Sequence, residues 1–576
     1  FWLNMIQFSH TIGRCFMLYK DLKIKRPEGT KSYKRNGSVY VYHVYESVYV
    51  PEKKYNLDKK KCVGKMIDDT YMNPNDNYFE FYDKQVENLE EPSPVCDTLK
   101  IGSYILIDHV LKTLQLDQIL SSVHGDCASL IMDLVEYVIV TENSVMQHYP
   151  YFGFDHGIFS SQIYDDSTIS LLFNQGISNF DIEVFQNAWN VLNNTEDEIY
   201  ISYDSTNMNT LAAGVEMAEF GKAKDNDEKP QVNLSYAIKH EDGTPLFHEL
   251  YPGSIIDISQ CQYMVDRAKE YGYKKIGFLL DRGYPSVENI KYFDRHGYGF
   301  LMMMKVNQKY VKEVVESVKM NLRMDVSTFI SNHKVFGKTV KGKLYASDEK
   351  ERYYHVYYDS VRAEQEKMSI LFEHEKIKKE LDRKVEKKLS RKEELRRFEK
   401  GFRLKYDDNG YLLGYREREG YVQKQCDEAG YFVLVSSKEM DAAEALEIYR
   451  NRDSIEKQFR ALKTEMGYKT YRVHSQTSLE AKTYVMFVAS IVRNYIYQRI
   501  KEINIKDKKN YTVPSAIREL EKVTITKSAS GEYIKRYGLT KKQKEIYKQF
   551  GIEEKDVNQM AQGYSKKMKL TKKKGD

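Results

Sequence analysis

Two short apolar runs that each end in an aspartate constrain the fold of this chain most strongly. IYISYD ends at Asp204 and KKIGFLLD ends at Asp281. An uninterrupted apolar run of this length is typical of a strand buried on both faces of a sheet. In α/β proteins, ligands and chemistry gather where such strands end. We therefore expect an α/β fold in which neighbouring strands bring the carboxylates of Asp204 and Asp281 together.

A charged helix follows much later in the chain. In YRNRDSIEKQFRALK, at about 100° per residue, four residues fall within a wedge of about 60° on one helix face: Tyr449, Arg452, Glu456 and Lys463. An apolar stripe runs beside this wedge and would pack the helix against a core: Ile448, Ile455, Phe459 and Leu462. We expect this helix to lie across the sheet and to add Glu456 to the two aspartates.

Three carboxylates in one place repel each other, and a divalent cation is the usual compensation. Oxygen ligands favour Mg²⁺ or Mn²⁺ over zinc. Two such ions about 3.5–4 Å apart activate the attacking oxygen and stabilise the leaving oxygen in phosphodiester chemistry. Under this interpretation Arg452 and Lys463 contact DNA phosphates, and Tyr449 stacks on or hydrogen-bonds to a displaced nucleotide.

Each of these residues alone also has an ordinary explanation. An aspartate after a strand is most often a turn or cap residue, and a glutamate between cations on a helix is usually part of a solvated face. A catalytic site is favoured only by the combination, in which two acids stand at strand ends and the third follows on a helix. Lys305, which closes GFLMMMK, is a weaker DNA-contact candidate, and Arg282 would pair with either a carboxylate or a phosphate.

Composition describes a globular chain of several structural units. Its 576 residues are 41% hydrophobic and 30% charged, and the net charge is +5, so an anionic partner must be held by local patches. One patch has 14 Lys/Arg against 5 Asp/Glu between Arg14 and Lys65, and the C-terminal tail is rich in lysine. A solvated end and a phosphate-contacting end explain that tail equally well.

Other features bear on the environment of the protein. The six cysteines are scattered without a CxxC pair, which argues against zinc ribbons and disulfides and favours a reducing compartment. No apolar run reaches the roughly 18–20 residues of a membrane helix, and the N-terminus does not resemble a signal peptide. Because the sequence begins with Phe1, we expect the first residues of the natural product to be missing.

The residue pattern changes several times along the chain, and these changes predict six segments. Strand-like, helical and strongly charged stretches succeed one another, and the clearest strand is SVYVYHVYESVYV, Ser38 to Val50. GISN and STIS resemble helix starts with polar caps, as does Asp441 with Glu444. The segments are a small β-rich unit (1–97), a helical region (98–195), a first core part (196–306), an insertion with its own β structure and a charged helix (307–425), a second core part (426–505) and a basic C-terminal region (506–576).

The spacing Tyr449-x2-Arg452-x3-Glu456-x6-Lys463 resembles the signature of DDE transposases of the insertion-sequence-four superfamily. YDST at Asp204, LLDRGYPS at Asp281 and RDSIEKQFRALK around Glu456 agree with it. Separations of 77 residues between the two aspartates and 175 residues from Asp281 to Glu456 are closest to the long-insertion subgroup. The resemblance covers about residues 98–500.

The resemblance implies an RNase H-like core interrupted by a β-rich insertion, with a helical N-terminal region and accessory terminal segments. It implies cut-and-paste transposition: hydrolysis frees a 3′-hydroxyl at each inverted repeat, and strand transfer joins it to target DNA. Asp204, Asp281 and Glu456 would bind two Mg²⁺ or Mn²⁺ ions. Tyr449, Arg452 and Lys463 would handle DNA near the cut. Partners would be double-stranded DNA and a second copy in a homodimer, in the nucleoid-associated cytoplasm of a bacterium. On chain order and charge we favour residues 1–195 for DNA-end recognition.

Three other functions stay open. A catalytically silent, transposase-derived DNA-binding protein would keep the fold without cutting. A metal-dependent nuclease would cut without joining. A structural assembly protein would use the charged helix Val361–Lys400 for oligomers and would show no metal-dependent activity.

Overall fold

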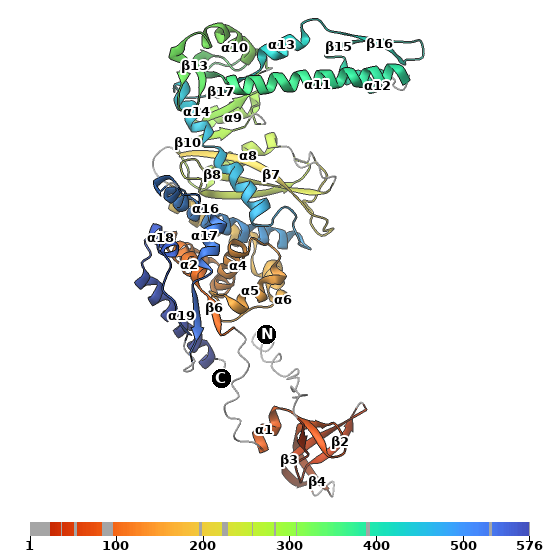
Figure 1. Cartoon of the computed structure of the whole chain (residues 1–576), viewed down its shortest axis with the longest axis vertical. Coiled ribbons are helices and arrows are strands. Elements are labelled where there is room, and N and C mark those ends of the chain that lie inside the picture. The colour runs from red at the N-terminus through yellow and green to blue at the C-terminus, as the bar shows by residue number, and fades with distance from the viewer. Residues whose placement is uncertain are drawn as a thin grey trace. The chain divides into compact units, whose positions relative to one another are not determined.

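The protein is described by a computed structural model that divides into two compact units, Phe1–Pro94 and Val95–Asp576. Figure 1 shows the elements of each unit. The structure describes residues 23–35, 37–50, 55–82, 96–194, 199–221, 229–255, 257–281, 284–306, 308–387, 392–507, 509–528 and 533–574. Arg282 lies outside these residues, and no helix within them is long and apolar enough to cross a membrane.

The first unit is a five-stranded antiparallel sheet with one short helix. The strand order is β1-β5-β4-β3-β2. Its small core contains the fully buried Val41, Val63 and Met72. The strand predicted at Ser38–Val50 is confirmed as β3 with the same bounds. The elements are β1 (Ile24–Lys25), β2 (Lys31–Arg35), β3, β4 (Tyr55–Met66), β5 (Tyr71–Pro74) and α1 (Asp76–Tyr82).

The second unit begins with a short strand and a group of helices. Ser178 caps α7 as GISN predicts, because its hydroxyl accepts a hydrogen bond from the backbone N–H of Asp181 and the Asp181 carboxylate accepts one in return. STIS lies inside α6, whose cap is Asp165. The elements are β6 (Thr98–Lys100), α2 (Gly102–Thr113), α3 (Leu116–His124), α4 (Ala128–Thr141), α5 (Tyr149–Asp155), α6 (Asp166–Leu171) and α7 (Asn179–Asn193).

A nine-stranded sheet forms the middle of this unit, in the order β12-β13-β14-β17-β11-β10-β7-β8-β9. Strand β10 pairs in parallel with β7 and β11, and the other pairs are antiparallel. All five residues of β10 are buried, as its apolar run predicts. The strands are β7 (Ile199–Asn209), β8 (Gln231–Lys239), β9 (Pro245–Pro252), β10 (Ile276–Leu280), β11 (Gly299–Met304), β12 (Phe329–Ile330), β13 (Val335–Gly342), β14 (Arg352–Tyr358) and β17 (Tyr431–Ser436).

Helices cover both faces of the sheet. On one face the core includes residues of α8 (Asp257–Glu270), α9 (Val287–His296) and α10 (Lys309–Leu322). On the other face α14 (Ala442–Arg450) packs Ala445, Leu446 and Tyr449 against strands that include β10 and β11. Successive strand residues alternate between these two cores.

The segment predicted as an insertion with its own β structure is arranged differently. Its strands β12, β13 and β14 continue the main sheet, and β14 pairs with β17. Only the hairpin of β15 (Phe402–Tyr406) and β16 (Leu412–Glu417) is separate. This hairpin lies beside the 28-residue helix α11 (Ser360–Lys387), which extends away from the sheet (Figure 1). A small core of its own includes Leu381, Phe398 and Leu412. The shorter helices are α12 (Lys392–Leu395) and α13 (Tyr421–Glu428).

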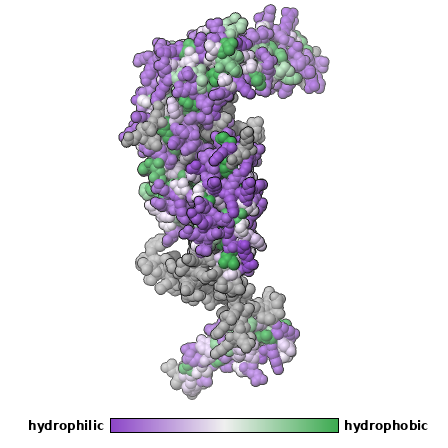
Figure 2. Space-filling view, turned by 60° about the vertical axis from the view of Figure 1, so that its left-hand side comes forward, coloured by the Kyte–Doolittle hydropathy of each residue, from purple (hydrophilic) through white to green (hydrophobic). Residues whose placement is uncertain are grey.

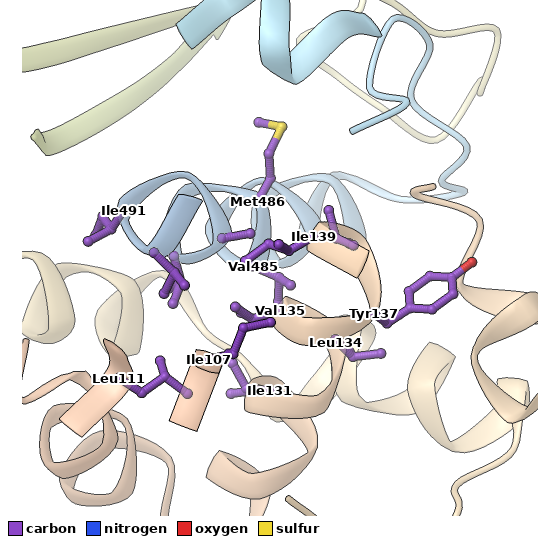
Figure 3. Packing of buried hydrophobic residues seen from close by; sticks show 14 of the residues in the cluster. Ile107, Leu111, Ile131, Leu134, Val135, Tyr137, Ile139, Val485, Met486 and Ile491 are labelled. Atoms are coloured by element: carbon purple, nitrogen blue, oxygen red, sulfur yellow. The ribbon is translucent and has the colours of Figure 1, made fainter. Parts of the chain in front are cut away.

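The C-terminal elements return to the first helices of the unit. The predicted helix Ser478–Lys501 is part of the longer α16 (Gln476–Asp507), whose Val485 faces Val135 of α4, whereas Met486 points away from α4 (Figure 3). Strand β18 pairs with β6. The remaining elements are α15 (Asp453–Arg460), α17 (Val513–Leu520), β18 (Thr524–Lys527), β19 (Tyr533–Ile534), α18 (Lys541–Gln549) and α19 (Glu554–Lys574). Over the face shown in Figure 2, hydrophilic side chains predominate and hydrophobic ones form small groups.

Candidate active site

The register of two parallel strands places Asp204 beside Asp281. Ser202 of β7 pairs with Leu279 of β10, and both aspartates stand two residues further along their strands. Neighbouring strands lie about 4.8 Å apart. The two backbones therefore present these carboxylates side by side at the end of β10.

Both aspartates belong to the face of the sheet that α14 covers. Tyr203 of β7 and Leu280 of β10 belong to the core on the α8–α10 side. Each aspartate directly follows one of these residues, and side chains alternate along a strand. Asp204 and Asp281 therefore belong to the opposite face, where Leu279 packs with α14 residues. The helix that carries the other predicted site residues is thus on the correct side of the sheet.

The prediction of one uninterrupted helix from Tyr449 to Lys463 is wrong. Helix α14 ends at Arg450, and α15 begins at Asp453. The backbone N–H of Arg452 donates to the carbonyl of Tyr449, three residues back, at 3.1 Å, which makes a turn tighter than an α-helical one. A π-helical turn, Ala461–Glu465, then follows α15. A uniform rotation of about 100° per residue therefore does not describe the segment from Tyr449 to Lys463.

Arg452 is nevertheless the centre of a compact ionic group. Its side chain is 6% exposed, and its Nη2 atom lies 3.1 Å from Glu456 Oε1 and 3.6 Å from Asp281 Oδ2. Burial opposes the charge on Arg452. Tyr449 and the three carboxylates of the site outweigh burial and raise the pKa of the guanidinium above its ordinary value. In this structure the guanidinium compensates the carboxylate charge.

Tyr449 contacts the same group. Its hydroxyl donates a hydrogen bond to Asp281 Oδ1 at 3.4 Å, and the Arg452 guanidinium lies 5.5 Å from the centre of its ring. Burial, together with Asp281, raises the pKa of Tyr449 well above its ordinary value, so the phenol stays neutral. A neutral hydroxyl here orients the Asp281 carboxylate.

The remaining predicted residues lie at the edges of this group. Lys463 is half-buried in the π-helical turn, and the exposed Lys305 follows the last residue of β11. Their roles in DNA contact stay predictions.

One supporting residue was not assigned from the sequence. Tyr284 packs edge-on against Tyr203, with ring centres 5.3 Å apart, and its N–H donates to the carbonyl of Asp281 at 3.0 Å. Its place in LLDRGYPS, three residues after Asp281, was the available signal.

The donor set suits a hard divalent cation, although the carboxylates are not gathered around one point. Asp204 and Asp281 would supply oxygen ligands from adjacent strands, as Mg²⁺ and Mn²⁺ prefer. Glu456 is 62% exposed and its carboxylate contacts Arg452. Among the residues that the structure describes, no group of three or more His, Cys, Asp or Glu side chains is arranged to hold a metal ion. The aspartates fit a metal, and Glu456 would join them after its carboxylate leaves Arg452.

A comparison with protein-family models identifies the class of protein. The family model described as "Transposase DDE domain" matches residues 196–492, which are 297 of the 576 residues. The match includes β7, β10, α14 and α15. The chain belongs to this transposase family.

Other comparisons add little. No curated protein matches the sequence. A cryo-electron microscopy structure of a piggyBac transposase synaptic complex with hairpin DNA is similar over 73% of this chain and 76% of that chain. The sequence identity is 10% and the TM-score is 0.31, a likeness too distant to support an argument.

Proposed function

We propose that this protein is a metal-dependent DNA transposase of the insertion-sequence-four superfamily, in its long-insertion subgroup. It would cut DNA at the inverted-repeat ends of a mobile element and join the freed ends to target DNA. The observation that carries the proposal is the matched register of Asp204 and Asp281, with Arg452 linking Asp281 to Glu456. The family match supports the same activity.

The arrangement of the sheet supports an RNase H-like core. Strands β7 to β11 are consecutive in the chain and contiguous in the sheet, and the two aspartates belong to its inner strands β7 and β10. The second core part would then be β17 with α14 and α15. The segment between β11 and β17 would be the insertion that characterises the subgroup, although most of its strands extend the main sheet.

Asp204, Asp281 and Glu456 would hold the metal ions. When bound, Mg²⁺ or Mn²⁺ supplies activation of the attacking oxygen and stabilisation of the leaving oxygen. In the first step a water oxygen would form a bond to phosphorus, and the bond from phosphorus to the 3′-oxygen would break. A proton from the water would pass to the departing 3′-oxygen, which gives a free 3′-hydroxyl. In the second step the oxygen of that 3′-hydroxyl would form a bond to phosphorus in a target phosphodiester, the bond from this phosphorus to the target's own 3′-oxygen would break, and the proton of the attacking hydroxyl would pass to the departing oxygen. Arg452 would turn from Glu456 towards a phosphate, because a guanidinium binds either anion through two N–H groups.

Cleavage and strand transfer on a labelled DNA end test the proposal. We expect wild-type protein with Mg²⁺ or Mn²⁺ to cut and join, and Glu456→Gln to lose both by about 10³-fold or more while still binding DNA. Glu444→Gln is the matched control, because Glu444 is an exposed carboxylate on α14. Equal activity of Glu456→Gln and wild type would remove Glu456 from the site.

The same experiment separates the alternatives. A catalytically silent DNA-binding protein would bind the labelled end without cutting it at any metal concentration. A nuclease would release the cut end and leave target DNA unjoined. Because both ends of an element must be held together, we also propose a homodimer on double-stranded DNA.

A further inference from the structure

A cavity of about 470 Å³ lies beside the helix that carries Glu456. It is enclosed by α15, the π-helical turn after it, α16, α17 and the residues just before α17. We call it the α15–α17 cavity. All of its walls belong to the second unit. Its volume is large enough for a single nucleotide.

The charge around the α15–α17 cavity is predominantly positive. Four basic side chains line it, against two acidic ones, Glu142 and Glu465. Arg518 lies 3.5 Å from Glu142, and Arg493 contacts Glu465. Within the described part of the chain, the exposed Lys457 and Arg460 make no ion pair. Two cations therefore stay available for an anion.

Arg493 is a buried cation in the wall of this cavity. Its side chain is 12% exposed and contacts the Glu465 carboxylate. Burial lowers the pKa of the Arg493 guanidinium to about 10, and Glu142 and Tyr497 only partly offset this effect. Because Arg493 already has a carboxylate partner, Lys457 and Arg460 are the side chains that would contact a bound anion.

Aromatic and amide groups make the remaining wall, and hydrogen bonds hold it in place. The half-buried rings of Tyr497 and Tyr511 line the cavity. Tyr511 is fixed by Asn504, whose side chain accepts from its N–H at 2.8 Å and donates to its carbonyl at 2.7 Å. Gln458 donates to Asn494 at 2.7 Å. These bonds fix the backbone of Tyr511, and its ring hydroxyl donates to Glu545 Oε2 at 3.4 Å. The two rings offer a surface on which a base of any sequence can stack.

The α15–α17 cavity and the candidate active site share helix α15. Lys457 directly follows Glu456, and Arg460 stands one helical turn after it on α15. Residues four apart on a helix are neighbours, with Cβ atoms about 5–6 Å apart. A DNA strand that contacts Glu456 would therefore pass Arg460 within one nucleotide spacing.

We propose that the α15–α17 cavity binds one nucleotide of a single DNA strand beside the cut. The base would lie against Tyr497 and Tyr511, and the adjoining phosphate would contact Arg460 and Lys457. The inference rests on the proposed function for the identity of the ligand, but the cavity itself is defined without any metal.

Photo-crosslinking of the full chain tests this site without metal. The probe is a five-nucleotide DNA strand with 5-iododeoxyuridine at its centre, and cross-linked residues are mapped by mass spectrometry. We expect cross-links at Tyr497 or Tyr511. Cross-links confined to other parts of the chain would overturn the proposal.

Variants give a second measurement. Arg460→Ala should reduce the slope of log affinity against log salt by about 0.7, the effect of one lost phosphate contact on a single strand. Arg460→Glu should weaken binding at least tenfold. Arg295→Ala, an exposed arginine on α9, is the matched control and should leave both values unchanged. Salt slopes equal to wild type for both Arg460 variants would contradict the proposal.

Two comparisons identify the source of the ligand and separate this inference from the proposed function. If dAMP binds as tightly as the five-nucleotide strand and competes fully with it, the ligand is a free nucleotide and the proposal of a DNA strand fails. If the strand cross-links in the cavity but no cleavage occurs with Mg²⁺ or Mn²⁺, the nucleotide site stands and the proposed enzymatic function fails.

Discussion

At the scale of single residues, Arg452 determines how the negative charge of the site carboxylates is compensated. A buried guanidinium among carboxylates is stable only while its partners stay charged. Asp281 and Glu456 provide that charge through contacts of 3.6 Å and 3.1 Å. The arginine thus occupies the electrostatic role that a divalent ion would fill, and a bound ion would compete with it for the same carboxylates.

Replacing Arg452 should therefore strengthen metal binding. At an effective dielectric constant near 20, Coulomb's law gives a repulsion of about 8 kcal/mol between a guanidinium and a divalent ion about 4 Å apart. Movement of the arginine side chain and solvent would relieve most of it, and a remainder of about 1.4 kcal/mol corresponds to about tenfold in affinity. We expect Arg452→Met to bind Mn²⁺ about tenfold more tightly, measured by electron paramagnetic resonance of the free ion. Arg295→Met should match wild type. Unchanged or weaker Mn²⁺ binding by Arg452→Met would show that the guanidinium does not compete with the metal.

At the scale of elements, the nine-stranded sheet contains three buried histidines whose protonation is unfavourable. Burial lowers the pKa of His240 and His355 to about 4. Burial, with a smaller contribution from Arg267, lowers the pKa of His248 to about 3. His248 packs on Phe487 of α16, with ring centres 4.7 Å apart. His248 therefore packs against α16 as a neutral imidazole.

The sheet should lose stability as the pH falls below about 6.5. The unfolded chain takes up protons on histidine below that pH, whereas the folded chain does so only near pH 3 to 4, so acid favours unfolding. For His248 alone the loss at pH 5 is about 2 kcal/mol. His248→Gln should be less stable at pH 7 but should lose about 2 kcal/mol less between pH 7 and pH 5, measured by urea unfolding. His296→Gln, an exposed residue of α9, should keep the wild-type pH dependence.

At the scale of the whole molecule, the second unit has a core that joins distant parts of the chain. One hydrophobic cluster contains Leu99 and Ile107 together with Leu520 and Tyr564. Tyr547 of α18 donates a hydrogen bond to the carbonyl of Gly102 at 2.9 Å. The first helices, the sheet and the C-terminal helices are therefore expected to fold as one body, separately from residues 1–94.

Deletion variants test this division. A chain of residues 95–576 should keep the thermal unfolding transition of the second unit within about 3 °C, because it retains the complete core, measured by circular dichroism. A chain of residues 195–576 should lose that transition, because it exposes the side of α16 that packs on α2 and α4. If the longer variant unfolds as well, the two units depend on each other.

Local signals in the sequence predicted several features correctly. The β-branched and aromatic run of Ser38–Val50 is β3, and the polar caps Ser178 and Asp441 begin α7 and α14. The apolar run before Asp281 is the buried strand β10. These features depend on side chains that act on their own backbone or on the period of burial, so short windows of sequence suffice.

Other features could not be read from short windows. A uniform helical period concealed the turn at Asn451–Arg452, because two of the carboxylates around Arg452, those of Asp204 and Asp281, come from strands far away in the chain. The C-terminal segment gave no local sign that β18 pairs with β6. The addition of β12, β13 and β14 to the main sheet was missed for the same reason.

By itself the sequence determined the types of element, the positions of the acids at strand ends and the charged helix that accompanies them. The tertiary structure decided which strands are neighbours, which register brings Asp204 beside Asp281, and that Arg452 rather than a third carboxylate contacts Asp281. Pairing and register depend on contacts between residues separated by tens to hundreds of positions, and only the folded chain brings those residues together.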